Sequence, residues 1–544
     1  MKAKRESGRG DGGFISGVFI LSVSTFIVKL IGLAYKIPMI ALLGAEGMGY
    51  FNSAYEIYAL LCVISTAGLP VALSMLVSSS RERGAYGEVR RVYRSAMTVF
   101  AVLGGIGCAF MLFFSDGLAR LIENPAAAPS VAAIAPALLF VCIASAVRGY
   151  FQGLCKMAPT AISQLIEALG KLILGVLFAN LALKAGYGIP AVAAFAILGI
   201  SIGALLSALY LLLLKAIHTH REKMRLVPTE QKDAGEGVVV SLFKIAIPIT
   251  LSSAAISLTR ITDMALIMRR LQDIGYSSAG ANAIYGSYTT LAVPVFGLIP
   301  SLITPVALAL VPRLSAAIER GSAEGQCSVS DSAMRITVFF AMPASVGVAV
   351  YSEQILSLLF SGEPEAVAVA APLLSALGIS ILFSCVITTA NAILQSYRQT
   401  TKPIISMVIG AAVKIVSAYI LIGIPSVGVW GAPVSTLLCN LTITAINIYF
   451  INKTVPRTGS VASIYARPFL ASVAMITVSY AVYMAVEFFG GNMLIAFAAA
   501  LVTALVSYFL FALVFGAVRE SDMLMLPAGS RALDIVRKTG LIRQ

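Results

Sequence analysis

Residues 13–44 of the 544-residue chain read GFISGVFILSVSTFIVKLIGLAYKIPMIALLG. The apolar run from Phe14 to Leu43 is long enough to span a bilayer as a helix, yet it contains Lys29 and Lys36. At about 1.5 Å per residue, Lys29 lies roughly 22 Å from Phe14, well inside the hydrocarbon. An unpaired cation there costs about 2.5–3.5 kcal/mol on insertion scales, so we expect it to face protein or water. Because the two lysines are seven residues apart, they lie on nearly the same face of the helix. This basic stripe within the membrane predicts an anionic ligand.

The composition indicates an all-α polytopic membrane protein with little chain outside the membrane. Hydrophobic residues make up 59% of the chain and charged residues only 12%, and the mean hydropathy is +0.92. Apolar runs of spanning length predict about fourteen transmembrane helices. Their expected ranges are 14–43, 50–78, 93–114, 131–153, 158–183, 189–214, 241–268, 282–311, 335–359, 366–394, 403–424, 428–451, 468–488 and 492–517.

The positions of the basic residues predict the topology. If the N-terminus is cytoplasmic, 29 Lys and Arg residues lie on the inner side and only four on the outer side. This asymmetry is the positive-inside pattern of a cell-membrane protein with both termini in the cytoplasm. The net charge of +14 therefore reflects loop topology, and we expect no binding of nucleic acid.

Signatures of catalysis and of metal binding are absent from the sequence. It contains no GxxxxGK[ST] phosphate-binding motif and no HExxH motif. The seven cysteines show no CxxC spacing, and the only two histidines, His218 and His220, share one basic loop. We therefore expect no enzyme and no metal site, and we interpret the first apolar run as a retained helix.

A weak internal repeat relates the two halves of the chain. Three polar residues recur 243 positions later: Gln152, Ser163 and Lys171 match Gln395, Ser406 and Lys414. Copies of six spans each have the same orientation, which predicts two parallel six-helix lobes. We assign 1–215 to the first lobe, 216–240 to a cytoplasmic linker, 241–452 to the second lobe, 453–517 to two extra helices and 518–544 to a cytoplasmic tail.

The charges within the spans are net basic. Three acids, Glu56, Glu167 and Asp263, lie among six cations: Lys29, Lys36, Lys171, Lys244, Arg260 and Lys414. One alternative is structural pairing, because Glu167 and Lys171 are four residues apart and Arg260 and Asp263 are three apart. Glu56 is then the structural partner expected for the first two lysines. The other alternative is substrate binding, for which the candidates are Lys29, Lys36, Glu56, Arg260, Lys414 and Lys171.

Two stretches carry a family resemblance. The run SVSTFIVKLIGLAYKIPMIALLGAEGMGYFNSAYEIYALLCVISTAGLPVALSMLVS (22–78) resembles the start of the lipid-linked oligosaccharide flippases of the MATE-like (MOP) exporter superfamily. It is most similar to the MurJ/SpoVB-type polysaccharide biosynthesis proteins. RGYFQGLCKMAPTAISQLIEALGK (148–171) is similar to the same family's motif at the end of span 4.

The resemblance implies a function. Such proteins move lipid II, or a related undecaprenyl-pyrophosphate-linked glycan, from the inner to the outer leaflet. It implies a V-shaped basic cavity between the lobes and a lipid-tail groove at the two extra helices. Lys29 matches a required basic position of the family's first helix, whereas Lys36 lies next to another, where this chain has Tyr35. The family's basic and acidic residues near the start of span 8 have no match in SYTTLAVP (287–294), so Arg260 and Lys414 are the alternatives for the second lobe.

We expect transport by alternating access. The pyrophosphate binds to Lys29 and Lys36 through charge-assisted hydrogen bonds while the polyprenyl tail stays in lipid. The alternatives for energy are the membrane potential and a coupling cation, H⁺ or Na⁺, with Glu56 or Asp263 as its site. We expect no cofactor.

Other functions stay open from sequence alone. One is export of another lipid-linked oligosaccharide, in a Wzx-like or sporulation-cortex role. A MATE-type cation or drug antiporter is disfavoured by the basic interior, and a sporulation assembly factor would not need the interior charges. The partners that we expect are a lipid-linked glycan, membrane lipids and the cell-wall synthesis machinery.

Overall fold

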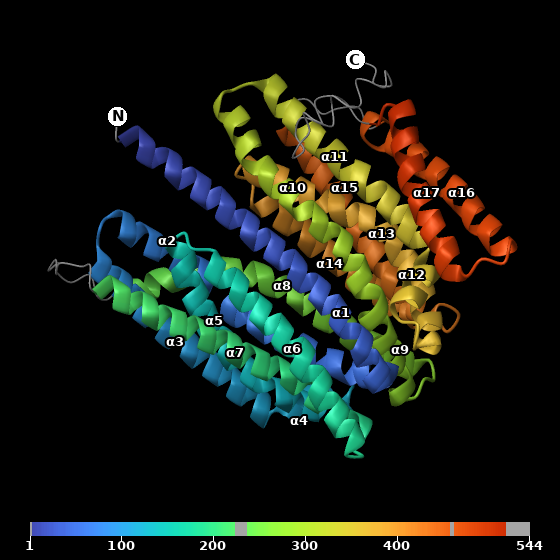
Figure 1. The fold of residues 1–544 in the computed structure, drawn as a ribbon, viewed down its shortest axis with the longest axis horizontal. Helices are drawn as coiled ribbons and strands as arrows, with labels where there is room; N and C mark the ends of the chain where they lie inside the picture. Colours follow the sequence, from blue (N-terminus) through green and yellow to red (C-terminus); the bar gives the residue numbers. More distant parts are fainter. Residues whose placement is uncertain (1–2, 224–236, 457–461, 518–544) are drawn as a thin grey trace. The chain divides into compact units, whose positions relative to one another are not determined.

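The computed structural model describes residues 3–223, 237–456 and 462–517 (Figure 1). Every regular element within these ranges is a helix, as the composition predicts. Contacts divide the chain into two compact units, Met1–Gly286 and Ser287–Gln544. The predicted tail 518–544, and residues 224–236 of the predicted linker, lie outside the described residues. The lobe boundaries given above stay a prediction.

The first unit contains helices α1 to α9. They are α1 (Ala3–Thr66), α2 (Leu69–Glu82), α3 (Tyr86–Phe113), α4 (Ser115–Leu121), the 3₁₀ turn η1 (Pro125–Ala127), α5 (Ala128–Gly153), α6 (Ala158–Lys184), α7 (Ile189–Lys223), α8 (Val238–Asp273) and α9 (Ser278–Ser287).

The second unit contains the remaining helices. They are the π-helical η2 (Tyr288–Ala292), α10 (Val293–Glu319), α11 (Ala323–Val350), α12 (Ser352–Leu359), α13 (Pro364–Ser396), α14 (Thr401–Ile422), the 3₁₀ turn η3 (Gly428–Trp430), α15 (Gly431–Thr454), the π-helical η4 (Ala462–Ala466), α16 (Arg467–Phe488) and α17 (Met493–Val514).

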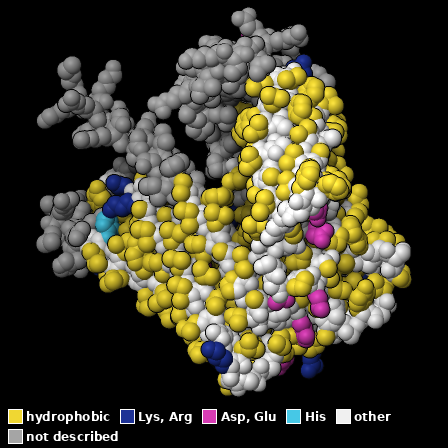
Figure 2. All heavy atoms as spheres, turned by 45° about the vertical axis from the view of Figure 1, so that its right-hand side comes forward, with side chains coloured by type: hydrophobic (Ala, Val, Ile, Leu, Met, Phe, Trp, Pro, Cys, Tyr) yellow, Lys and Arg dark blue, Asp and Glu magenta, His cyan; other side chains and the backbone are white. Residues whose placement is uncertain are grey.

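These helices carry the predicted membrane spans. Twelve helical stretches of the described residues are long and apolar enough to cross a membrane. One of them, Val23–Arg81, covers residues 23–43 of the first predicted span and all of the second, and the predicted span 241–268 lies on α8. Apolar side chains are widely exposed, with Phe113 and Phe488 each 85% accessible, and they cover much of the face in Figure 2. Because water-soluble proteins rarely expose apolar surface so widely, the chain is a multi-pass membrane protein.

Several predicted helix boundaries are wrong. The expected gap after residue 43 is only a kink at Gly44, whose φ of 66° suits a residue without a side chain. The chain breaks instead at Gly68, inside the predicted span 50–78, and Pro70 lies in the first turn of α2. Helix α11 begins at Ala323, twelve residues before the predicted span 335–359, and the Ser322 hydroxyl accepts a hydrogen bond from the Gly325 amide at its start. Hydropathy locates the apolar core of a helix, not its polar ends.

Helices α6 and α7 approach each other closely along a seam of glycines. A Cβ on Gly170 would lie 2.7 Å from Gly203 Cα, and one on Gly199 would lie 2.5 Å from Gly175 Cα. Small residues allow such contact between membrane helices. This seam holds the middle of α6 against α7 and so fixes the turn that carries Glu167 and Lys171.

A buried polar cluster joins α1 to α9 within the first unit. Asn282 Nδ2 donates to the Glu46 carbonyl at 2.6 Å, and Asn282 Oδ1 accepts from Asn124 Nδ2 at 2.7 Å. Asn124 Nδ2 also donates to Ser53 Oγ at 3.0 Å. Gly49 leaves the room that the Asn282 side chain occupies. These hydrogen bonds hold α9 against α1.

Within the second unit, the last two helices, α16 and α17, pack against α11 and the residue that follows it through tyrosines. Tyr508 Oη on α17 donates to the Phe339 carbonyl of α11 at 2.6 Å. The hydroxyls of Tyr351 and Ser479 lie 2.7 Å apart, and Ser479 lies on α16. The lipid-tail role expected for this pair stays a prediction.

Candidate functional site

The ammonium group of Lys171 lies against three aromatic rings of α1. Its Nζ is 4.8 Å from the ring centre of Tyr35, 5.1 Å from that of Tyr55 and 6.0 Å from that of Phe51. Such contacts stabilise a cation by about 0.5–2 kcal/mol each, the larger value where water is excluded. Tyr35 is only 1% exposed, so this aromatic cage is part of the packed core of the first unit. The cage holds a positive charge without neutralising it.

Lys36 and Glu56 lie beside this cage. Both are half-buried on α1, and Lys36 interacts electrostatically with Glu56 and with Lys171. Glu56 is thus close to Lys36, as the structural alternative predicted. Glu167 also interacts electrostatically with Lys171, but its carboxylate is paired with Arg148. Taken together, Lys36, Lys171, Glu56, Glu167 and Arg148 carry three positive and two negative charges, so this group is net positive. A net positive cluster in a membrane-spanning bundle has the charge that an anionic ligand requires.

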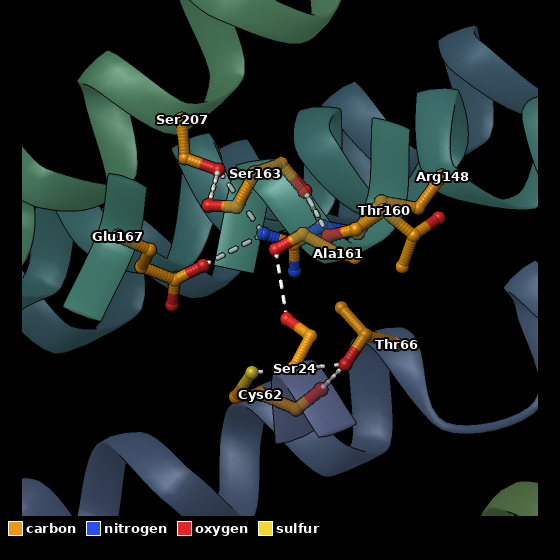
Figure 3. A network of polar contacts seen from close by, with 9 residues as sticks. All are labelled: Ser24, Cys62, Thr66, Arg148, Thr160, Ala161, Ser163, Glu167 and Ser207. Atoms are coloured by element: carbon orange, nitrogen blue, oxygen red, sulfur yellow. Dashed lines mark hydrogen bonds and ion pairs between the residues drawn. The ribbon is translucent and has the colours of Figure 1, made fainter. Parts of the chain in front are cut away.

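A second polar cluster, the Arg148 node, lies one turn away on α5, α6 and α7 (Figure 3). Arg148 Nη2 pairs with Glu167 Oε2 at 2.8 Å and donates to Ser207 Oγ at 3.0 Å, while its Nε donates to Ser163 Oγ at 2.9 Å. Ser207 Oγ donates to the Ser163 carbonyl at 2.9 Å. In Figure 3 the Arg148 side chain lies between the two serines and the carboxylate.

This node corrects one alternative drawn from the sequence. The i, i+4 spacing favoured an ion pair between Glu167 and Lys171, but the described structure pairs Glu167 with Arg148. Arg148 is one of the 29 basic residues that the sequence assigns to the inner side, so its pairing with Glu167 was not predicted. The signal available was its place at the head of RGYFQG, which continues an apolar helix and is not a loop.

The remaining candidates are more scattered. Lys29 is exposed on α1, and no ion pair of Lys29 occurs among the described residues. Arg260 is exposed on α8 and interacts electrostatically with Tyr55 of the cage, whereas Asp263 lies one turn further along the same helix. Lys414 is half-buried on α14, in the second unit. The structure thus gathers Lys36, Glu56 and Lys171, with Arg260 in electrostatic range of the cage.

The second unit repeats the Arg148 node without charge. Ser406 Oγ donates to Asn447 Oδ1 at 2.6 Å, and Asn447 Nδ2 donates to Asn391 Oδ1 at 2.9 Å. Asn391 and Ser406 match Arg148 and Ser163 at the offset of 243 seen in the sequence. The turns before α6 and α14 also match, because Cys155 and Arg398 have the same unusual φ, 59° and 58°. The repeat is therefore present in local structure as well as in sequence.

The fold and its charged interior define a polytopic membrane protein of the transporter type. The family model described as "Polysaccharide biosynthesis protein" matches residues 14–318, and the MatE model matches residues 248–420. Because the first match covers more than half of the chain, the chain belongs to the polysaccharide biosynthesis protein family, within the MATE-like superfamily that its motifs resemble.

Relatives cover nearly all of the chain. Stage V sporulation protein B of Bacillus subtilis (strain 168) is 25% identical over 528 residues, 96% of this chain and 99% of that protein. The lipid II flippase MurJ of the same organism is 28% identical over 431 residues, 74% of this chain and 76% of that protein. A solved structure of the lipid II flippase MurJ, in an inward closed conformation, matches with a TM-score of 0.69. It is 17% identical, covers 91% of this chain and 98% of that one, and so supports the fold.

Proposed function

We propose that the chain is a flippase that moves an undecaprenyl-pyrophosphate-linked glycan, most specifically lipid II, from the inner to the outer leaflet. The observation that carries the proposal is the caged ammonium of Lys171. This ammonium lies in a membrane-spanning unit, over aromatic rings and beside Lys36. The neighbouring carboxylate of Glu167 is paired with Arg148. The proposed activity is transport without covalent chemistry.

In this proposal the pyrophosphate binds to Lys171 and Lys36. Lysine offers a compact charge with three donors, which suits phosphate oxygens, and a low dielectric strengthens the contact. Lys29, Arg260 and Lys414 contribute at other stages of the passage. The polyprenyl tail stays in lipid, and a conformational change exposes the head group to each leaflet in turn.

A second substrate is supported by a specific observation. Similarity to stage V sporulation protein B spans 96% of this chain, whereas similarity to the lipid II flippase spans 74%. A lipid-linked glycan used in sporulation is therefore the alternative to lipid II. Both substrates share the pyrophosphate and differ in the glycan.

We also propose the orientation and the energy source. The positive-inside pattern places both termini in the cytoplasm. Moving one elementary charge across a membrane potential of 100 mV changes its free energy by about 2.3 kcal/mol. Because the cell interior is negative, the potential favours outward movement of an anion. Glu56, beside Lys36, and Asp263 are the candidate sites for a coupling H⁺ or Na⁺. Cell-wall synthesis enzymes that use the exported glycan are the expected partners.

Complementation tests the proposal. A Gram-positive strain depleted of its own lipid II flippases should grow when the wild type is expressed, and Lys171→Ala and Lys36→Ala should not restore growth at matched membrane levels. Lys184→Ala is the matched control, because Lys184 is an exposed lysine at the far end of the same helix. Rescue by every variant would show that the interior charges are structural. No rescue by well-expressed wild type would exclude lipid II and favour the other glycan.

A further inference from the structure

The pairing of Glu167 departs from what its own helix favours. Glu167 precedes Lys171 by four residues, which is the favourable order for an ion pair within a helix. The two groups also interact electrostatically across one turn. Yet the carboxylate is 2.8 Å from Arg148, on another helix, while Lys171 lies over the aromatic rings. The Arg148 guanidinium therefore competes with Lys171 for the Glu167 carboxylate.

We propose that Arg148 is a positioning residue that holds the Glu167 carboxylate away from Lys171, so that the Lys171 ammonium stays available to the anionic group of the transported lipid. The inference rests on the proposed function, because it takes Lys171 to bind that group. It assigns Arg148 no contact with the substrate.

The geometry of Arg148 suits this role. Its Nε and Nη2 donate to Ser163 and Ser207, which fix the plane of the guanidinium while Nη2 also reaches the carboxylate. The Arg148 side chain is only 12% exposed and that of Glu167 is 28% exposed, so water competes weakly for the pair. A planar fork can make these contacts together, whereas a lysine would make fewer of them.

The second unit supplies an internal comparison. There the residue that matches Glu167 is Gly410, so no acid lies four residues before Lys414. The residue that matches Arg148 is Asn391, which accepts a hydrogen bond from Asn447 in a neutral node. The arginine is thus present in the copy that contains the acid and missing from the copy that lacks it. A purely architectural node needs no charge, as the second unit shows.

The test compares single and double variants of the full chain. Undecaprenyl diphosphate is the probe, and its binding to purified protein in detergent is measured together with the melting temperature. Arg148→Gln can keep the hydrogen bond to Ser163, which Arg148 makes through Nε, but it is too short to make the contacts of Nη2 with Ser207 and Glu167. Glu167 is then free to pair with Lys171, and we expect affinity to fall about tenfold. Arg148→Gln combined with Glu167→Gln should bind within about threefold of wild type, because neither residue can then neutralise Lys171. Arg148→Asn, alone and with Glu167→Gln, repeats the comparison with the side chain of the second unit.

The outcomes separate the two proposals. Loss of binding in the single variants at an unchanged melting temperature, with recovery in the doubles, supports the positioning role. A loss of binding that accompanies a lower melting temperature, with both reversed in the doubles, would overturn it, because an unpaired Glu167 is itself a largely buried charge that destabilises the fold. Equal binding by wild type and folded Arg148→Gln would overturn the positioning role and leave the proposed function intact. Double variants that fold but bind as weakly as the singles would also overturn it. Absence of saturable binding by the wild type would overturn the proposed function, and this inference with it.

Discussion

Replacing Gly203 with alanine should disturb the turn of α6 that carries the site. A Cβ at this position would lie 2.9 Å from the Glu167 carbonyl oxygen, 3.0 Å from the Lys171 amide nitrogen and 3.3 Å from the Gly170 carbonyl carbon. All three are backbone atoms, so no flexible side chain can move aside. The new methyl group must therefore push α6 and α7 apart.

The cost follows from these distances. Overpacking in a close-packed interior typically costs about 1–3 kcal/mol. For a unit of this size that corresponds to a fall of about 2–12 °C in melting temperature. We expect Gly203→Ala to melt lower by this amount and to bind undecaprenyl diphosphate more weakly, because the turn between Glu167 and Lys171 shifts with the helix.

The assay is thermal unfolding of purified protein in detergent, with Gly105→Ala as the matched control. Gly105 lies within α3, and a Cβ there would meet no heavy atom within 4 Å. The control should melt within about 2 °C of wild type or slightly higher, because alanine favours the helix over glycine. If Gly203→Ala and Gly105→Ala melt alike, the close contact between α6 and α7 is not as tight as the glycine seam requires, and the reasoning fails.

Three further predictions concern other parts of the chain. Asn447→Ala removes the centre of the neutral node and leaves Ser406 and Asn391 without this partner. The melting temperature should fall by an amount equivalent to about 1–3 kcal/mol, and an unchanged melting curve would contradict the stabilising role of these hydrogen bonds. Tyr508→Phe loses the 2.6 Å hydrogen bond to the Phe339 carbonyl, and hydrogen exchange in α17 should accelerate, whereas protection equal to wild type would refute the proposed attachment. Cys155 is exposed and Cys142 is buried, so a membrane-impermeant maleimide should label Cys155 in inverted vesicles but not in intact cells; labelling in intact cells would reverse the orientation.

Much of the architecture could be predicted from sequence because hydropathy and charge act locally. Each of the fourteen predicted spans is mostly helical, although the spans 50–78 and 335–359 each contain a break between two helices. The weak repeat at an offset of 243 reappears in two turns and two polar nodes. Helix ends were less predictable, since polar residues continue α11 beyond its apolar part. The early break at Gly68 was not predicted because it lies at a close contact with α8, which local sequence does not reveal. A Cβ added to Gly68 would clash with the carbonyl oxygen of Ala246 on α8.

The site was predictable in its residue types and not in its pairing. A cation far inside an apolar run is visible in sequence, which is how Lys36 and Lys171 became candidates. The partner of Glu167 lies across a turn and on another helix, so helix periodicity alone favoured the wrong neighbour. The rings of Tyr35 and Tyr55 meet Lys171 only after α1 packs against α6, more than a hundred residues along the chain.

The most direct test of the central claim is flipping of fluorescently labelled lipid II in proteoliposomes that contain the purified chain. A membrane-impermeant quencher reports the labelled lipid that reaches the outer leaflet. We expect the wild type to accelerate transfer over empty liposomes, Lys184→Gln to match it, and Lys171→Gln to be slower by about tenfold or more. Transfer by Lys171→Gln at the wild-type rate would contradict the claim that the caged lysine binds the substrate.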